Sequence, residues 1–322
     1  MNLQKFIFQK VRNLFADHSD WSKKIAETLK ISRESVYRRE REEVPLMSKE
    51  IELLCREFNI NLDEFLLSGP QTIMFRYTSL NMTKMDNYVH YIHSLLAHLE
   101  NVSKSEEKEI VFCADDIPIF HFMAFPELTY FKLYIWSQSV VDLGIPYEDF
   151  VYEIKKLHIG DLFSKLHSRY LEIPSREIWS ELTLMRFLGL LEYYESIDSF
   201  REKTSVRTLI FQLRALLDNL KNWTQSQEKN LGVGFELYIS PLDLGLSQML
   251  CRQEGQSSVL IKLYTINSIA TYDRRYVEET SDWIKALLKK SICLSLSAEK
   301  ERVRFFREME RNIEQLCQRI EY

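Results

Sequence analysis

The chain is poor in the residues that interrupt regular structure, with 8 glycines and 7 prolines among 322 residues. Such scarcity argues against barrels, glycine-rich nucleotide-binding loops and long disordered linkers. No apolar run reaches the roughly 18 residues that a membrane span needs. No charged segment followed by an apolar run opens the sequence, so we expect no signal peptide. These absences together predict a cytoplasmic protein without a membrane partner.

The sequence also lacks the motifs that commonly accompany catalysis. It contains no G-x-G-x-x-G, no G-x-x-x-x-G-K-[ST], no G-x-S-x-G and no H-E-x-x-H. The five cysteines are scattered and form no C-x-x-C pair, which is typical of reduced thiols. His90 and His93 are one helical turn apart, but no further ligand at helical spacing completes a metal set. We therefore expect no enzyme activity, no metal and no cofactor.

What the chain has is enough apolar residues for two domains, since 45% of it is hydrophobic. Gly69-Pro70 interrupts the periodic pattern, and we place the domain boundary there. Residues 1–69 then form one domain and residues 70–322 form the other. A candidate sub-boundary lies near residues 225–232.

Residues 21–41, WSKKIAETLKISRESVYRRER, predict two short helices joined by a tight turn. Ile25, Ala26 and Leu29 recur at helical spacing and form the apolar face of the first helix. Ser32 is suited to be the N-cap of the second helix, because its hydroxyl can accept from the free N–H groups of the next turn. The segment therefore has the pattern of a helix-turn-helix.

The second helix of this segment has an inner and an outer side. Val36 faces the shared core. The positions that face outward are Arg33, Glu34, Tyr37 and Arg38. Residues 21–41 carry seven basic and three acidic side chains, a net charge of +4 (7 − 3), whereas the whole chain carries −5. Basic charge gathered on such an element is the electrostatic footprint of DNA binding.

Helical stripes on both sides of this segment predict a domain of five short helices with a small core. The apolar residues of these stripes are Phe6, Ile7, Val11 and Leu14 before the segment and Ile51, Leu54, Cys55, Phe58, Phe65 and Leu66 after it. Ser48 and Asn61 stand where they can cap the last two helices.

This arrangement resembles the Xre-like, or phage-repressor-type, helix-turn-helix family over roughly residues 4–67. The resemblance is carried by Ile25-Ala26, Leu29, Ile31-Ser32, residues 36–40, and a later run from Ile51 to Leu66. It implies sequence-specific binding of double-stranded DNA by a homodimer on paired half-sites.

The resemblance also implies roles for single residues. Arg33, Glu34 and Arg38 fall where the family reads bases, and Tyr37 joins them as an expected base-reading residue because it also faces outward. Trp21, Ser22 and Arg41 fall where the family contacts phosphates, and the basic charge of Lys23 adds it to the expected contacts to the DNA backbone. Glu40 falls where the family has a structural glutamate. Lys30 and Glu42 stand where the family usually has glycine, and a non-glycine residue with a positive φ costs free energy. Arg39 stands where the family tends to have an apolar or aromatic residue.

The rest of the chain predicts mostly helices. These are expected at residues 81–102, from Pro126, and at residues 147–156, 161–171, 176–194, 206–223, 281–290 and 298–320. Strands are expected at residues 109–114, 235–239, 248–252 and 259–264, the last two as a hairpin. Asp115 and Asp116 are expected to cap the helix that follows. The predicted fold class is mainly α with a small α+β component: a five-helix domain, then a mostly helical domain with a few antiparallel strands.

The helix at residues 81–102 has a second interpretation. Its apolar residues follow heptad spacing, which favours a dimerisation helix. These residues are Met85, Tyr88, Ile92, Leu95 and Leu99. The alternative is an ordinary amphipathic helix packed within its own domain.

Two functional interpretations remain open. In the first, the protein is a DNA-binding transcriptional regulator whose second domain dimerises and senses a small molecule or peptide, because that domain is large and rich in aromatic residues. In the second, the helix-turn-helix is a protein-interaction adaptor, and the second domain is the working part, an enzyme included.

Overall fold

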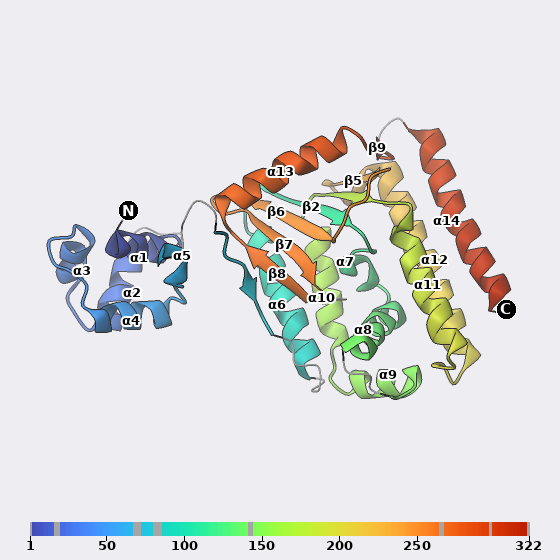
Figure 1. The fold of residues 1–322 in the computed structure, drawn as a ribbon, viewed down its shortest axis with the longest axis horizontal. Coiled ribbons are helices and arrows are strands. Elements are labelled where there is room, and N and C mark those ends of the chain that lie inside the picture. Colours follow the sequence, from blue (N-terminus) through green and yellow to red (C-terminus); the bar gives the residue numbers. More distant parts are fainter. Residues whose placement is uncertain are drawn as a thin grey trace. The chain divides into compact units, whose positions relative to one another are not determined.

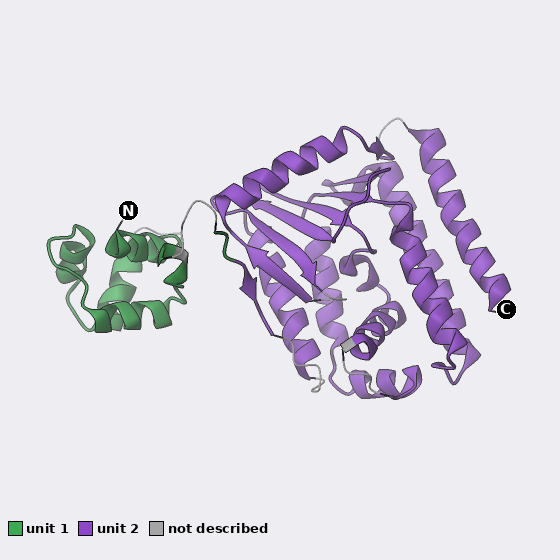
Figure 2. Ribbon diagram, viewed as in Figure 1, with its two compact units in different colours: residues 1–74 green, residues 75–322 purple. Residues whose placement is uncertain are grey.

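The computed structural model describes residues 2–15, 20–66, 72–79, 86–140, 144–263, 267–295 and 298–320. The chain divides into two compact units, residues 1–74 and residues 75–322 (Figure 2). The division falls a few residues after Gly69-Pro70, where the sequence places it.

Unit 1 contains the five helices that the sequence predicts. They are α1 (Leu3–Arg12), α2 (Asp20–Leu29), α3 (Arg33–Glu40), α4 (Ser48–Glu57) and α5 (Asp63–Leu66) (Figure 1). One apolar cluster joins them, and Ile7, Val11, Ile25, Val36 and Leu54 are its fully buried residues. The predicted stripes are therefore mostly the sides on which these helices pack, but the prediction is wrong for Leu14 and Leu66, because both side chains are exposed.

The turn between α2 and α3 forms as the sequence predicts. The Ser32 hydroxyl accepts a hydrogen bond from the Ser35 N–H at 3.2 Å, which confirms the predicted N-cap. Lys30 has φ +55° and Glu42 has φ +64°, so both occupy the left-handed region that favours glycine. The backbone therefore has a left-handed conformation at Lys30, in the turn between α2 and α3, and at Glu42, after α3, although neither residue is glycine.

The caps at the N-terminal ends of α4 and α5 differ in detail from the prediction. Ser48 is the first residue of α4, and Met47 occupies its N-cap position. The Met47 N–H donates to the Glu50 carboxylate at 2.9 Å, so Glu50 satisfies the backbone donor of the N-cap residue. Asn61 accepts from the Asp63 N–H at 2.9 Å at the start of α5.

Unit 2 is built on a mixed nine-stranded sheet, and this overturns the predicted fold class. The strands are β1 (Arg76–Tyr77), β2 (Lys108–Ala114), β3 (Ser175–Trp179), β4 (Glu228–Asn230), β5 (Val233–Ile239), β6 (Gln248–Gln253), β7 (Ser258–Leu263), β8 (Asn267–Thr271) and β9 (Ile292–Cys293). Their order is β1-β8-β7-β6-β2-β3-β5-β4, with β9 also pairing with β5. A sheet of this size is not a small component of a mainly helical fold.

The sheet has a parallel part and an antiparallel part that meet at β2. Strand β3 pairs in parallel with both β2 and β5. On its other edge β2 pairs antiparallel with β6, which continues into β7, β8 and β1. The predicted hairpin is β6–β7. The predicted helix at residues 176–194 is wrong in its first part, because residues 175–179 form the central strand β3 and the helix begins at Leu182.

Helices cover both faces of this sheet (Figure 1). They are α6 (Asp86–Ser103), α7 (Ile119–Phe122), α8 (Pro126–Val140), α9 (Tyr147–Lys155), α10 (Gly160–Leu171), α11 (Leu182–Ser196), α12 (Lys203–Ser226), α13 (Arg274–Leu288) and α14 (Glu299–Arg319). Helix α13 begins earlier than the sequence predicts. The candidate sub-boundary near residues 225–232 covers the end of α12, strand β4 and the turn to β5. All of these lie within unit 2.

Alternate residues of β2 enter two different cores, as the period of a strand requires. Ile110 and Ala114 belong to the large core shared with most of the helices, whereas Val111 and Cys113 pack toward α13.

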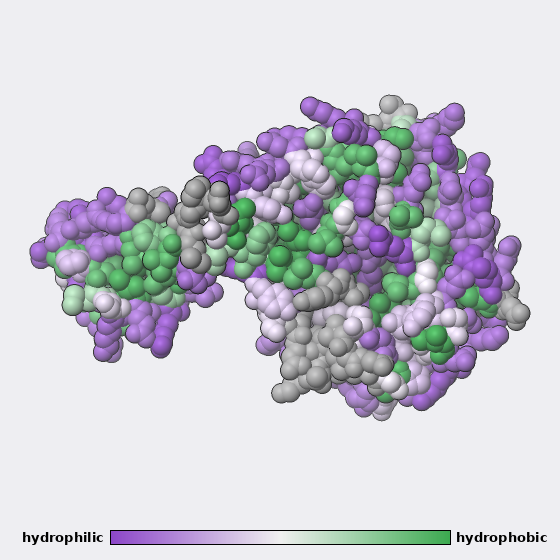
Figure 3. All heavy atoms as spheres, viewed as in Figure 1, coloured by the Kyte–Doolittle hydropathy of each residue, from purple (hydrophilic) through white to green (hydrophobic). Residues whose placement is uncertain are grey.

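The surface of unit 2 carries both hydrophilic and hydrophobic residues. Figure 3 shows hydrophilic residues along α13 and α14 and hydrophobic residues over β7 and β8. No helix in the described ranges combines the length and the apolar character needed to cross a bilayer.

The apolar stripe of α6 packs inside unit 2. Tyr88, Ile92, Leu95 and Leu99 are all buried in the large core, and the Tyr88 ring lies 4.9 Å from that of Trp136. Met85 lies outside the described residues. Because these side chains are covered within their own unit, they are not available as a dimer surface. The structure therefore favours the alternative, an ordinary amphipathic helix.

Candidate nucleic-acid interface

The packing of α3 on α2 determines which side chains of α3 are exposed. Val36 is fully buried against Ile25 and the rest of the unit 1 core. This contact leaves the outer side of α3 to three exposed residues, Arg33, Glu34 and Arg38. Three of the four expected base-reading side chains thus lie on the surface of one helix.

Tyr37, the fourth expected base-reading residue, is half-buried. Its ring stands nearly perpendicular to that of Trp21, with the centroids 5.6 Å apart. Its hydroxyl lies 3.2 Å from the Ser22 hydroxyl, and this hydrogen bond lowers the pKa of Tyr37. The Ser22 hydroxyl also accepts from the Arg33 guanidinium at 2.9 Å. Tyr37, Ser22 and Arg33 therefore connect the start of α2 with α3.

Two of the four expected contacts to the DNA backbone are buried. Trp21 is 1% exposed, and the Ser22 side chain is also fully covered. Because neither side chain can reach a phosphate without rearrangement, their expected role needs correction: they hold α2 and α3 together. Lys23 and Arg41 are exposed, as the resemblance requires.

Acidic residues neutralise part of the local positive charge. Arg38 and Arg41 each approach Glu43 at 3.4 Å, and Lys24 approaches Glu57 at 3.5 Å. Lys23 has no ion-pair partner among the described residues. The net +4 counted along residues 21–41 therefore overstates the charge of this surface.

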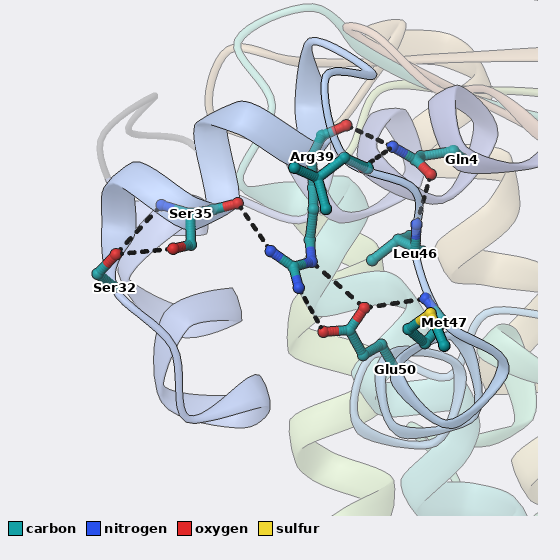
Figure 4. Close-up of polar contacts among 8 residues, drawn as sticks. Gln4, Ser32, Ser35, Arg39, Leu46, Met47 and Glu50 are labelled. Carbon is teal, nitrogen blue, oxygen red and sulfur yellow. Dashed lines mark hydrogen bonds and ion pairs between the residues drawn. The ribbon is translucent and has the colours of Figure 1, made fainter.

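Arg39 locks the inner side of α3 to α4 (Figure 4). Its guanidinium donates to both carboxylate oxygens of Glu50, at 2.9 and 3.2 Å, and to the Ser35 carbonyl at 3.2 Å. The Arg39 side chain is only 15% exposed. Such a bidentate pair is geometrically specific as well as strong. Arg39 takes the place of the apolar residue that the family tends to have there.

Gln4 of α1 fixes the segment that follows α3 (Figure 4). Its Nε2 donates to the Arg39 carbonyl at 2.5 Å and to the Val44 carbonyl at 3.0 Å. Its Oε1 accepts from the Leu46 N–H at 2.7 Å. One amide thus satisfies three backbone groups, and the sequence gives no signal for it because the partners are about 40 residues away.

Glu40 has the structural role that the resemblance implies. It forms an ion pair with Arg12 of α1 at 2.7 Å. The Arg12 guanidinium in turn lies over the Trp21 ring, 4.7 Å from its centroid. Glu40, Arg39 and Gln4 together tie α3 to α1 and α4, so the outer side of α3 is presented on a fixed helix.

Comparison with protein-family models, curated proteins and solved structures finds no match to this chain. Within the described part of the chain, no group of three or more metal-ligating side chains is placed to hold a metal ion. Two arginines and one glutamate on the exposed side of α3 provide hydrogen-bond donors and a carboxylate acceptor.

Proposed function

We propose that the protein is a cytoplasmic, sequence-specific transcriptional regulator that binds double-stranded DNA by placing α3 in the major groove. The observation that carries this proposal is the division of α3 into a fixed inner side and an exposed outer side. Val36 and Arg39 hold the inner side, and Arg33, Glu34 and Arg38 form the outer side. A recognition helix needs both, because base readout depends on side chains presented from a rigid frame.

The exposed residues suit complementary base contacts. Arginine pairs with the O6 and N7 acceptors of guanine, and glutamate accepts from the N4 amino group of cytosine. The pair between Arg38 and Glu43 is long and exposed, so Arg38 can leave it at little cost in free energy. Lys23 and Arg41 supply phosphate contacts. Tyr37 acts as a positioning residue through Ser22 and Trp21.

The protein acts in this proposal as a homodimer on paired half-sites, with an effector bound by unit 2. The buried stripe of α6 takes no part in the dimer contact. Regulation follows when effector binding changes the spacing or mobility of the two recognition helices.

In-vitro selection from random duplex DNA by the full-length chain, at near-physiological salt, tests the proposal. We expect enrichment of an inverted repeat whose half-sites are about one DNA turn, roughly 34 Å, apart. No enrichment by protein shown to be folded would overturn it. That outcome would favour the alternative, a protein-interaction adaptor. The ion pairs that Arg38, Arg41 and Lys24 form with glutamates are consistent with that alternative.

Two pairs of variants separate base readout from charge. Arg38→Ala should reduce discrimination at one base position by about 1–3 kcal/mol. Its matched control is Arg56→Ala, since Arg56 is exposed on α4 and pairs with Glu52 at 2.9 Å. An unchanged site preference for Arg38→Ala would contradict its assignment.

Lys23→Ala should weaken binding to all sequences alike and lower the salt dependence by about one counterion. The matched control is Lys49→Ala, because Lys49 is exposed on α4. Equal effects of the two variants would show that Lys23 contributes only general charge.

A further inference from the structure

A cavity of about 70 Å³ lies in unit 2 at the carboxyl end of β2. It is lined by residues of α6, α7 and α8, of the connection from β2 to α7, and of β2, β6, β7 and β8. In sheets with parallel strands, ligands bind beyond the carboxyl ends of strands at a point where the strand order changes direction. The strand order reverses beside β2, since β3 and β5 follow it on one side and β6 lies on its other side.

Most of the cavity wall is apolar. Its main contributors are Tyr91, Leu95, Phe112, Phe120, Met249 and Leu260. An apolar wall with a few convergent polar groups is the usual composition of a small-molecule site. The wall therefore suits the aliphatic or aromatic body of a small ligand.

The charged residues of the cavity are Asp116, Lys132 and Lys262, and Ser247, Gln248, Asn267 and Ser268 also line it. Both lysine ammonium groups donate to the same oxygen, Oδ2 of Asp116, that of Lys262 at 2.9 Å. The other oxygen, Oδ1, is buried and accepts no hydrogen bond from any described residue. Leaving a buried acceptor without a donor is unfavourable, so Oδ1 is a strong potential partner for a ligand O–H or N–H.

The charged groups at this end are not limited to these three. Two lysines face Asp116, and Asp115, which pairs with Arg186 at 2.9 Å, also lies close enough to Lys262 for that ammonium to act on its pKa. Burial raises the pKa of Asp116, but Lys132 and Lys262 outweigh it and hold this pKa below its ordinary value. The carboxylate is therefore ionised and acts only as an acceptor. Lys132 is buried with Asp116, whereas the Lys262 side chain is 26% exposed and is the ammonium that an entering anion can reach.

We propose that this cavity binds a small organic carboxylate with an apolar body and a hydroxyl next to the carboxylate, a 2-hydroxy acid. The ligand carboxylate pairs with Nζ of Lys262, the hydroxyl donates to Oδ1 of Asp116, and the body lies against the apolar wall. An amino acid satisfies Oδ1 as well, but it places an ammonium beside two lysines.

The role of this ligand as an effector rests on the proposed DNA-binding function, whereas its binding does not. Unit 2 alone provides every residue of the site. The experiment therefore measures binding and the response of DNA affinity separately.

Titration calorimetry of the full chain with three probes of one shape tests the binding. The probes are 2-hydroxypropanoate, alanine and propanoate, which are small enough for a cavity of about 70 Å³. We expect the hydroxy acid to bind most tightly, and the analogue without the hydroxyl to bind about tenfold more weakly or worse, because Oδ1 then stays without a donor. Absence of binding by all three, equal binding with and without the hydroxyl, or tightest binding by alanine would each overturn the assignment.

Lys262→Met tests the carboxylate contact and should weaken binding of the hydroxy acid about tenfold or more. This residue is partly exposed, so the variant should fold, and its melting curve checks this. The matched control is Lys285→Met, because Lys285 is an exposed lysine of α13 outside the cavity, paired with Asp282 at 2.8 Å. Equal affinity of Lys262→Met and the unchanged chain would overturn the site.

Anisotropy of the selected DNA, with and without the hydroxy acid, then tests the effector role. A change in DNA affinity that Lys262→Met abolishes supports it. Ligand binding with unchanged DNA affinity would refute the effector role alone. Ligand binding by a chain that selects no DNA would refute the proposed function and leave the binding site standing.

Discussion

The two units of this protein treat charged side chains in opposite ways. In the described part of unit 1 every charged side chain keeps some exposure, and its ion pairs lie around an apolar core. Unit 2 instead buries Asp116, His121, Lys132, Glu177 and Lys229. The difference indicates that unit 1 keeps its described charged side chains at the surface, whereas unit 2, besides its exposed charges, also places several inside the fold and beside its cavity.

Glu177 shows what a fully satisfied buried charge looks like. His121 Nε2 lies 2.8 and 2.9 Å from its two oxygens. The Tyr170 hydroxyl donates to Oε1 at 2.5 Å and the Trp179 indole N–H donates to Oε2 at 2.8 Å. Asp116 differs, since one of its oxygens has no donor among the described residues. Glu177 is therefore a structural centre, and Asp116 is half of a binding site.

The largest effect is expected from removing the Glu177 carboxylate. Glu177→Ala leaves His121, Tyr170 and Trp179 without their buried acceptor, and should lower the free energy of unfolding by about 3–5 kcal/mol. Urea unfolding followed by circular dichroism measures this loss. Glu236→Ala is the control, because Glu236 on neighbouring β5 is partly exposed and pairs with Arg176 at 3.1 Å. It should cost less than about 1 kcal/mol, and similar losses for both would refute the contrast between buried and exposed charge.

Lowering the pH should also remove the stability that the buried Glu177 carboxylate contributes. Burial raises the pKa of Glu177, but His121 and the hydrogen bonds from Tyr170 and Trp179 outweigh it, and the pKa lies below the ordinary value of 4.5. A lowered carboxyl pKa stabilises the fold above the unfolded pKa, and this stability is lost as the pH falls through the folded pKa. Unfolding measured between about pH 6 and pH 3 should show a loss below pH 4.5 that is smaller in Glu177→Gln. Equal losses would mean that other carboxyls dominate.

Replacing the neighbouring residues Arg38 and Arg39 of α3 should change the free energy of unfolding by different amounts. Arg39→Ala breaks the bidentate pair with Glu50 and should destabilise unit 1 by about 1–2 kcal/mol. Arg38→Ala removes only an exposed pair and should change stability by less than about 0.5 kcal/mol. Thermal and urea unfolding of both variants decide this. A larger loss for Arg38→Ala would contradict the division of α3 into a fixed and an exposed side.

The smallest effect concerns the strained turn of unit 1. Lys30→Gly should stabilise the unit by about 0.5–1 kcal/mol, because glycine adopts a positive φ without strain. Lys23→Gly is the control inside α2 and should destabilise by a similar amount, about 0.5–1 kcal/mol. Urea unfolding measures both, and a loss of stability in Lys30→Gly would show that the Lys30 side chain makes a needed contact.

Unit 1 could be predicted from sequence because its determinants are local. The stripe of Ile25, Ala26 and Leu29, the Ser32 cap and the return of Val36 all act within about one or two helical turns. The predictions for unit 1 that failed depend instead on contacts between residues far apart in the sequence. The burial of Ser22 depends on Tyr37 and Arg33, and the fixing of α3 depends on Gln4 and Glu50 from other helices.

The sheet of unit 2 could be predicted only in part. Strand β3, SREIW, has a charged residue at its centre, and Glu177 is satisfied only by groups brought together in the folded unit. The sequence therefore favours a helix there. Asp115 and Asp116 look like helix caps for a similar reason. Asp115 pairs with Arg186, while Asp116 meets Lys132 and Lys262, which is 146 residues away.

The pairing of distant strands has a consequence for the order in which the chain folds. Strand β2 needs β6, from Lys108 opposite Gln253 onward, and β1 needs β8, with Arg76 opposite Ala270. Long-range pairing of this kind is slow and must wait until both partners have been synthesised. Unit 1 depends on contacts within its own 74 residues. We expect the helix-turn-helix to fold while the chain is still on the ribosome, before the sheet of unit 2 can close.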